Sequence, residues 1–242
     1  MTQKKIKIVF LTGLDLSKES GISTFRGNNG IGNDLDWEFC SSVEGMKMDT
    51  TRFLDFYNRR RLQLAQAKPN AAHSMIAELE KDYDVTVITH NEDDLHERAG
   101  STNVFHLKGE LTKVCSTKNP QNPKYIRKYP LTTPIKFGDE AGDGSQLRPY
   151  VTLFGEHISN MTRAKQIVEG ADIFVVVGIS LFVYPGAILA ECANLHKEIF
   201  KYIIDVNDME AYRTLGYHCI QATPIVGMKT LLDIFSKNHK VI

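Results

Sequence analysis

The chain has 242 residues, enough to bury a sizeable core as one large domain or as one domain with a small lobe. Its 29 basic and 29 acidic side chains balance, so no overall field favours nucleic acid or an anionic membrane. No apolar run reaches the roughly 18 residues of a membrane-spanning helix. The apolar stretch near the N-terminus is short and is typical of a first core strand rather than a signal peptide. We therefore expect a cytoplasmic protein, and the sequence leaves its oligomeric state open.

Apolar and β-branched runs alternate with amphipathic stretches along the chain. The runs predict strands at residues 6–11, 85–89, 104–107, 173–177 and 200–204. The stretches predict helices at residues 50–66, 71–81, 95–99, 158–170, 186–196 and 224–236. This alternation is typical of an α/β fold, a Rossmann-like parallel sheet with helices on both faces.

Two segments rich in turn signals interrupt this pattern. We expect a large domain from residues 1–27, 71–111 and 148–242, and a small helical or irregular lobe from residues 28–70 and 112–147. The chain is expected to rejoin the main sheet at Arg148. The cleft between the lobes is the expected site.

The first strand ends at Gly13, where a dinucleotide-binding fold opens its first helix and offers free N–H groups to a pyrophosphate. Leu14, Asp15 and Ser17 follow. A carboxylate about 4 Å from a phosphate costs roughly 4 kcal/mol at an effective dielectric near 20. Two compatible interpretations of Asp15 remain: a helix N-cap, or a built-in carboxylate that occupies the helix end an anion would otherwise use.

The predicted helix 50–66 places Tyr57 and Arg60 on one face, because residues three apart are neighbours on a helix. Arginine binds a carboxylate bidentately, and tyrosine adds a hydroxyl donor. The pair would therefore suit an acidic acyl group. The alternative is a solvated basic face, since Arg59–Arg61 form a basic run.

Four ordered motifs carry a resemblance to the sirtuins, the NAD-dependent protein deacylases. They are LTGLDLSKESGISTFRG at 11–27, THNEDDLHERAG at 89–100 with KGE at 108–110, LRPYVTLFGE at 147–156, and GISLFVYP at 178–185. The resemblance implies NAD as cofactor and an acyl-lysine protein or peptide as partner. It implies cofactor contacts from Gly13, Leu14, Asp15, Phe25, Arg26, His90, Asn91, Asp93, Gly178, Ser180 and Asp205.

The resemblance also concerns metal and acyl preference. Many sirtuins hold zinc with four cysteines, whereas the interval 112–146 contains only Cys115, and the chain has no C-x-x-C pair. The chain is therefore similar to the zinc-free bacterial branch, and no metal is expected. Tyr57 and Arg60 resemble the acyl site of the branch that accepts succinyl- and malonyl-lysine.

The departures from the family pattern fall on chemical positions. Lys108 stands where the family has its catalytic His, beside the retained Asn91 and Asp93. Leu14 and Asp15 replace an Ala and a Gly. Other replacements at cofactor-facing positions are His90 for Gln, Glu92 for Ile, and Ile179 for Thr.

Lys108 has three interpretations: a general base, a member of an ion pair, or a solvated lysine. A base works best with a pKa near the ambient pH, whereas lysine starts near about 10.4. Only deep burial without an anionic partner would depress it far enough. We therefore favour an ion pair with Asp15, Glu92 or Asp93 over the other two.

The degenerate motifs predict a sirtuin-fold protein that acts by binding and has lost, or strongly reduced, its catalysis, with weak or absent NAD binding. The alternative is an active NAD-dependent protein deacylase. A third reading is ADP-ribosyl transfer or NAD cleavage without deacylation.

Overall fold

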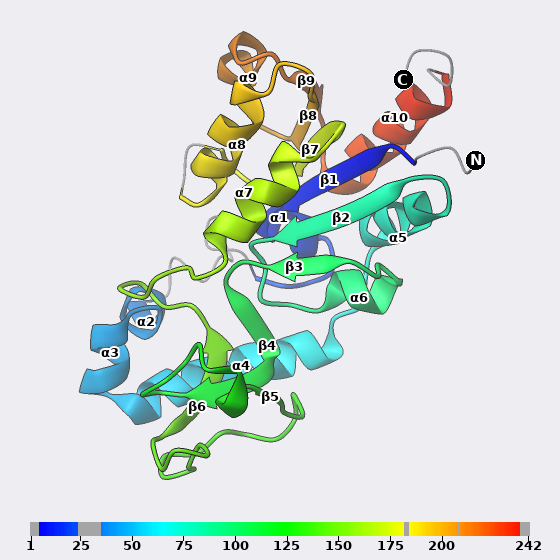
Figure 1. The fold of residues 1–242 in the computed structure, drawn as a ribbon. Coiled ribbons are helices and arrows are strands. Elements are labelled where there is room, and N and C mark those ends of the chain that lie inside the picture. The colour runs from blue at the N-terminus through cyan, green and yellow to red at the C-terminus, as the bar shows by residue number, and fades with distance from the viewer. Residues whose placement is uncertain (1–4, 24–34, 182–183, 208, 238–242) are drawn as a thin grey trace.

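The computed structural model describes residues 5–23, 35–181, 184–207 and 209–237, and the structural statements below concern these ranges. Its larger part is a six-stranded sheet in the order β3-β2-β1-β7-β8-β9, in which all neighbours run parallel (Figure 1). The strands span Lys7–Thr12 (β1), Asp84–Thr89 (β2), Val104–His106 (β3), Ile173–Val177 (β7), Phe200–Asp205 (β8) and His218–Gln221 (β9). The predicted Rossmann-like sheet is confirmed.

Helices cover both faces of this sheet and bury its alternating side chains. One core joins it to α1 (Leu14–Lys18), α5 (Ala71–Glu78, continued by a 3₁₀ turn over Leu79–Lys81) and α10 (Pro224–Lys237). The opposite core joins it to α7 (Met161–Glu169), α8 (Gly186–Leu195) and α9 (Glu210–Thr214). In β1, Phe10 enters the first core and Leu11 the second, as the period of a strand requires.

A smaller lobe lies beyond the edge of the main sheet (Figure 1). It contains α2 (Leu35–Cys40), α3 (Val43–Met48) and α4 (Thr50–Gln66). These helices share a core with a three-stranded antiparallel sheet in the order β5-β4-β6. The sheet consists of β4 (Gly109–Ser116), β5 (Arg127–Lys128) and β6 (Leu147–Val151), with a 3₁₀ turn over Pro123–Tyr125.

The small sheet corrects one expectation from the sequence. Residues 147–151 pair with β4 and not with the main sheet, so the expected return at Arg148 is wrong. The main sheet resumes only at β7, after α7. The other lobe boundaries stay predictions.

The helix α4 is fastened to the small sheet by Arg61, a fully buried guanidinium. Arg61 donates to the backbone carbonyls of Pro130 at 2.6 Å, Thr133 at 2.8 Å and Leu111 at 3.3 Å. Because Leu111 lies in β4 and Pro130 and Thr133 lie in one turn, a single side chain holds the helix, β4 and the 130–133 loop together.

The chain passes from β3 to β4 through Leu107 and Lys108, and Gly109 is the first residue of β4. Gly109 has φ +83°, and a Cβ there would lie 2.2 Å from the carbonyl oxygen of Tyr150, so only glycine fits. Next to it, the N–H of Thr152 donates to the carbonyl of Lys108 at 2.8 Å. The residue at the family's catalytic position therefore lies where the two sheets adjoin.

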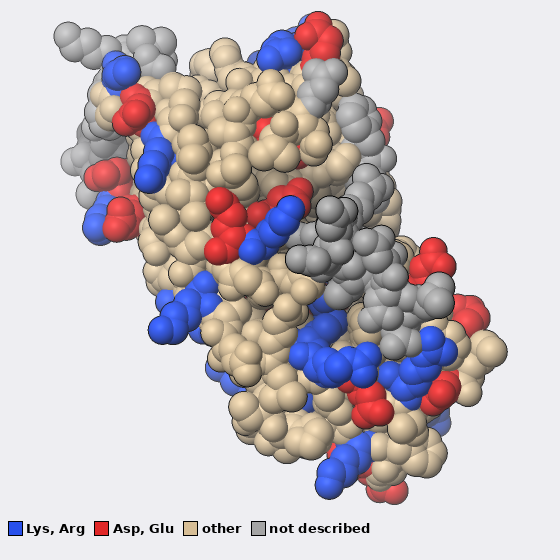
Figure 2. Space-filling model, turned by 180° about the vertical axis from the view of Figure 1, so that it is seen from behind, with Lys and Arg blue, Asp and Glu red and all other residues tan. Residues whose placement is uncertain are grey.

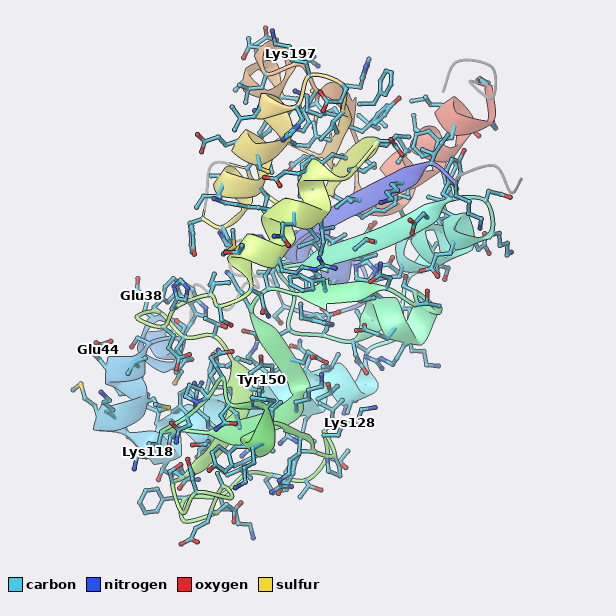
Figure 3. All side chains as sticks on the ribbon, in the orientation of Figure 1. Glu38, Glu44, Lys118, Lys128, Tyr150 and Lys197 are labelled. Carbon is cyan, nitrogen blue, oxygen red and sulfur yellow. The ribbon has the colours of Figure 1, made fainter. Side chains whose placement is uncertain are left out.

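Basic and acidic side chains are interspersed over the back of the molecule (Figure 2), in keeping with the balanced composition. Figure 3 shows side chains packed between the main sheet and its helices, with the labelled Tyr150 in the small lobe and Lys197 at the far end of the large one.

Among the helices of the described ranges, none is long and apolar enough to span a bilayer.

Candidate functional site

Two tight turns meet where the strand order of the main sheet reverses, between β1 and β7. Open α/β sheets bind ligands outside the carboxyl ends of their strands at such a point. A Cβ at Gly13 would lie 2.6 Å from Cβ of Ile179, and one at Gly178 would lie 2.7 Å from the backbone nitrogen of Leu16. Both predicted cofactor glycines are thus needed for the close packing of these turns, and Leu14 opens α1 between them.

Asp15 lies in the first turn of α1, and Gly13 is the N-cap without any side-chain cap. The N-cap interpretation of Asp15 is therefore wrong. Burial raises the pKa of the Asp15 carboxyl, and the nearby charge of Asp205 raises it further, against a smaller effect of Lys18. Asp205, at the end of β8, accepts from the backbone and the side-chain amide of Asn207 at 2.9 and 2.7 Å. The two carboxylates are thus close enough for their charges to interact.

Beneath the first turn of α1, three buried polar side chains form one network. The Ser17 hydroxyl donates to Oδ2 of Asp93 at 2.8 Å and accepts from Nδ2 of Asn91 at 2.9 Å. Nδ2 of Asn91 also donates to the Gly13 carbonyl at 3.0 Å, and Oδ1 of Asp93 accepts from the N–H of Leu95 at 3.1 Å. Burial raises the pKa of Asp93, while the bond from Ser17 works against that rise. The structure thus uses Asn91 and Asp93 to join α1 to the loop after β2.

His90 and Lys108 are close enough for their charges to interact. Burial, reinforced by the charge of Lys108, lowers the pKa of His90 well below its usual value, so the ring is neutral. Burial also lowers the pKa of Lys108, while the charge of Glu92 opposes that change. Within the described ranges, Lys108 forms no ion pair with Asp15, Glu92 or Asp93. The favoured ion-pair prediction is therefore wrong.

Glu92 pairs instead with Arg60, whose Nη2 lies 3.4 Å from Oε2 of Glu92. The two side chains are 9% and 15% exposed. Tyr57 lies one turn earlier in α4 and is buried against the rings of Phe53 and Phe56. Burial raises the pKa of its hydroxyl, and Glu92 is the next largest cause. The predicted acyl-site pair is thus brought together, with a carboxylate of the chain itself beside it.

Three buried polar atoms of this region lack a hydrogen-bond partner among the described residues: Nη1 of Arg60, Nε2 of His90 and Oδ1 of Asn91. Such atoms are rare in proteins, and each one calls for an explanation. Their gathering near one set of strand ends is what a ligand site with open donors and acceptors would show. Of the remaining predicted residues, Ser180 follows the Gly178 turn, and Phe25 and Arg26 lie outside the described residues.

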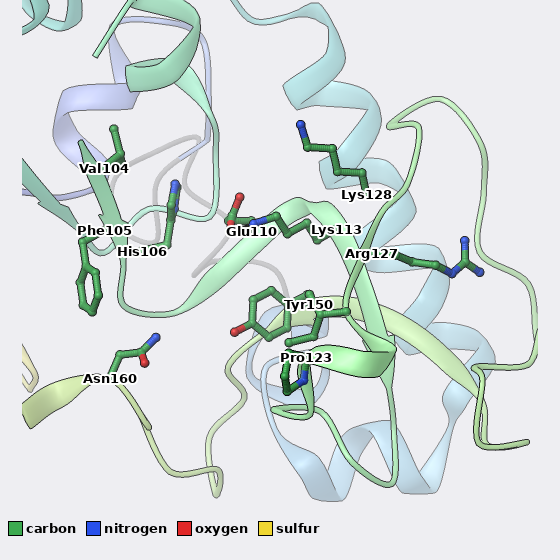
Figure 4. Close-up of a pocket in the computed structure, with 11 residues that line it drawn as sticks. Val104, Phe105, His106, Glu110, Lys113, Pro123, Arg127, Lys128, Tyr150 and Asn160 are labelled. Carbon is green, nitrogen blue, oxygen red and sulfur yellow. Dashed lines mark hydrogen bonds and ion pairs between the residues drawn. The ribbon is translucent and has the colours of Figure 1, made fainter. Parts of the chain in front are cut away.

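A cavity of about 470 Å³ that the sequence did not indicate lies between β3 and the small sheet (Figure 4). His106 and Glu110 approach each other beside it, while Arg127 points away. Nε2 of His106 also lies 2.7 Å from Glu97. Among the described residues, Glu97, His106 and Glu110 are the only acidic, His or Cys side chains close enough to share a metal ion. The side chains of these three residues already have partners, because Glu97 pairs with His106 and Glu110 pairs with Lys113.

Comparisons with known proteins agree with this arrangement. The family model described as Sir2 family matches residues 13–185. An NAD-dependent protein deacylase of Bacteroides thetaiotaomicron is 45% identical over 228 residues, 94% of this chain and 97% of the relative. One of Helicobacter pylori is 41% identical over 225 residues, 93% of this chain and 95% of the relative.

Solved structures of Sir2 homologues have the same fold as this chain. A mutant Sir2 homologue in complex with ADP ribose superposes with a TM-score of 0.85 at 31% identity, covering 98% of this chain and 95% of that one. A Sir2 homologue in complex with NAD gives a TM-score of 0.83 at 31% identity, covering 97% and 91%. With sequence motifs, fold and relatives in agreement over nearly its whole length, the chain belongs to the Sir2 family.

Proposed function

We propose that this Sir2-family chain binds acyl-lysine in proteins or peptides and has lost, or strongly reduced, NAD-dependent deacylation. The relatives that bear the deacylase name span almost all of the chain, which supports a shared substrate class. The observation that carries the loss of catalysis is the carboxylate of Asp15 in the first turn of α1, at the strand ends where a dinucleotide would lie.

The residues present do not fit a pyrophosphate at the first turn of α1. The charge of Asp15 is already disfavoured by burial and by Asp205, and an anion there would add a further repulsion. While Asp15 is ionised, a phosphate about 4 Å away would be repelled by roughly 4 kcal/mol at an effective dielectric near 20, or about a thousandfold in affinity. The N–H of Asp15 is also occupied, since it donates to the carbonyl of Gly178 at 3.2 Å.

A second candidate, an active NAD-dependent deacylase, is favoured by the state of Lys108. Burial lowers the pKa of Lys108, and no described side chain pairs with it, which moves the amine toward the neutral form a base needs. We rank this candidate second for two reasons. The charge of Glu92 opposes the lowering of the Lys108 pKa, and the Asp15 carboxyl remains at the end of α1 where a pyrophosphate would bind.

The proposal includes a zinc-free lobe and a cytoplasmic location. All four cysteines are free thiols, and no cysteine belongs to the described group of metal-ligand side chains. Cysteines without a C-x-x-C arrangement are poor zinc ligands. The balanced charge gives no attraction toward nucleic acid.

Calorimetric titration of the full chain with NAD tests the proposal, with the Bacteroides thetaiotaomicron relative as positive control. We expect no saturation at micromolar NAD for this chain and saturation for the relative. An acetyl-lysine peptide, titrated by fluorescence anisotropy against its unacetylated form, should bind in the absence of NAD. Micromolar NAD affinity, or equal binding of both peptides, would refute the proposal.

A deacylase assay of Lys108→His separates the two candidates. We expect no measurable turnover from this variant, because restoring the histidine leaves Asp15 and Glu92 in place. Turnover restored by the single substitution would show that the site is otherwise competent and would favour the active enzyme. Lys113→His, a lysine beside the Figure 4 cavity, controls for a nonspecific effect of an added imidazole.

A further inference from the structure

The contact between Arg60 and Glu92 brings together two segments that are distant in the sequence. Arg60 projects from α4 in the small lobe, and Glu92 follows β2 in the large one. Their charged atoms lie 3.4 Å apart, and both side chains are largely buried. The carboxylate that a guanidinium of this kind would take from a ligand is here supplied by the chain.

We propose that Glu92 is an internal occupant of the acyl-carboxylate subsite, and that it makes this chain select lysines with uncharged acyl groups. The inference rests on the proposed function, because it requires that acyl-lysine binds beside Tyr57 and Arg60. It assigns Glu92 the role of a specificity-determining residue.

The charges around Glu92 support exclusion of a second carboxylate. Arg60 is the one described cation within ion-pair distance of it, since Lys108 acts on Glu92 only from farther away. A succinyl or malonyl carboxylate would have to share that guanidinium with Glu92, and two carboxylates on one site repel each other. Arg148, the other cation that acts on Tyr57, is already paired with Glu156.

An uncharged acyl group meets no such conflict. Nη1 of Arg60 is buried and has no partner among the described residues. The carbonyl oxygen of an acetyl or longer neutral acyl amide can accept from this N–H without adding a negative charge. The subsite therefore keeps an unpaired donor for a neutral acceptor while its anion position is filled.

The test compares acetyl-lysine and succinyl-lysine peptides of one sequence, titrated by fluorescence anisotropy against the wild type and Glu92→Gln. The wild type should bind the acetyl peptide at least about tenfold more tightly than the succinyl peptide. Glu92→Gln should tighten succinyl binding by about tenfold or more and change acetyl binding by less than about threefold. Glu198→Gln, which removes the carboxylate of an exposed pair with His196, should change neither affinity.

A double variant, Glu92→Gln with Arg60→Gln, guards against an effect of unpaired Arg60 on folding. It removes both charges and should not gain succinyl binding. A wild type that prefers the succinyl peptide, or a Glu92→Gln variant that binds both peptides as the wild type does, would overturn the assignment. If neither peptide binds any of these proteins more tightly than its unacylated form, the proposed function itself fails.

Discussion

Replacing Ser17 by alanine removes one hydroxyl from the centre of the buried network. That hydroxyl donates to Asp93 at 2.8 Å and accepts from Asn91 at 2.9 Å. Relative exposures are 0% for Ser17, 1% for Asn91 and 5% for Asp93, so water cannot readily replace the lost partner. We expect Ser17→Ala to destabilise the protein while leaving the sheet intact.

The expected magnitude follows from the charge of the acceptor. A hydrogen bond to a charged group contributes about 1.5–3 kcal/mol, and Asn91 keeps its second bond, to the Gly13 carbonyl. We therefore expect the free energy of unfolding to fall by about 2 kcal/mol. For a chain of this size the melting temperature should drop by about 4–8 °C.

The loss should depend on pH in a defined direction. Burial raises the pKa of Asp93 above its ordinary value of 3.8, and the Ser17 bond opposes that rise, so Ser17→Ala raises this pKa further. A carboxyl whose folded pKa is raised costs stability while it is ionised, above its folded pKa, and the cost is relieved as pH falls through that pKa. The effect of the substitution should therefore be largest near neutral pH and shrink in acid.

Urea unfolding of wild type and variant at about pH 7 and about pH 5 measures this difference. Ser159→Ala is the matched control, because its hydroxyl makes an exposed bond to Gln121 at 3.1 Å and should matter by less than about 0.5 kcal/mol. A change below that size at neutral pH, or one that grows in acid, would refute the reasoning.

Three further outcomes are expected. Asp15→Asn should stabilise the protein near neutral pH, where burial and Asp205 disfavour the charged carboxylate, and should tighten NAD binding in calorimetry; a weaker affinity would contradict the repulsion. Gly109→Ala should cost more than about 3 kcal/mol in urea unfolding, since its Cβ would meet the Tyr150 carbonyl at 2.2 Å. Burial lowers the pKa of His106, but the bond and charge of Glu97 raise it overall. Glu97→Gln should therefore destabilise most below about pH 6.5 and least above the folded pKa; equal loss at every pH would exclude this pair as the cause.

The central strands of the main sheet could be predicted from composition because both of their faces are buried, whereas the edge strand β9, which is partly exposed, was missed. The predicted strand 173–177 coincides with β7, and all five of its residues are buried. The small sheet was missed for physical reasons. β5 has two residues, and β6 contains Pro149, a residue that argues against a strand except at an edge, the position that β6 holds.

At the site, the sequence showed that the adjacent carboxylates of Glu92 and Asp93 need partners, but it did not show which residues those partners are. The neighbouring Glu92 and Asp93 implied a cation, and Lys108, at the family's catalytic position, was the expected one. The structure separates the two carboxylates, with Asp93 held by Ser17 and Glu92 directed to Arg60. That choice depends on how α4 packs beside the end of β2, a long-range contact that no local pattern encodes.

The backbone bond from Thr152 to the Lys108 carbonyl, at 2.8 Å, extends the pairing of β4 with β6 to the residue through which the chain leaves the main sheet. Gly109 lies opposite Val151 in the adjoining strand pair, so neither partner can shift without the other. A tilt of one lobe against the other would turn the Lys108 backbone and swing its amine relative to His90. The chemistry of that position is thus coupled to the shape of the whole molecule, and a ligand that wedges the lobes apart would alter it without touching it.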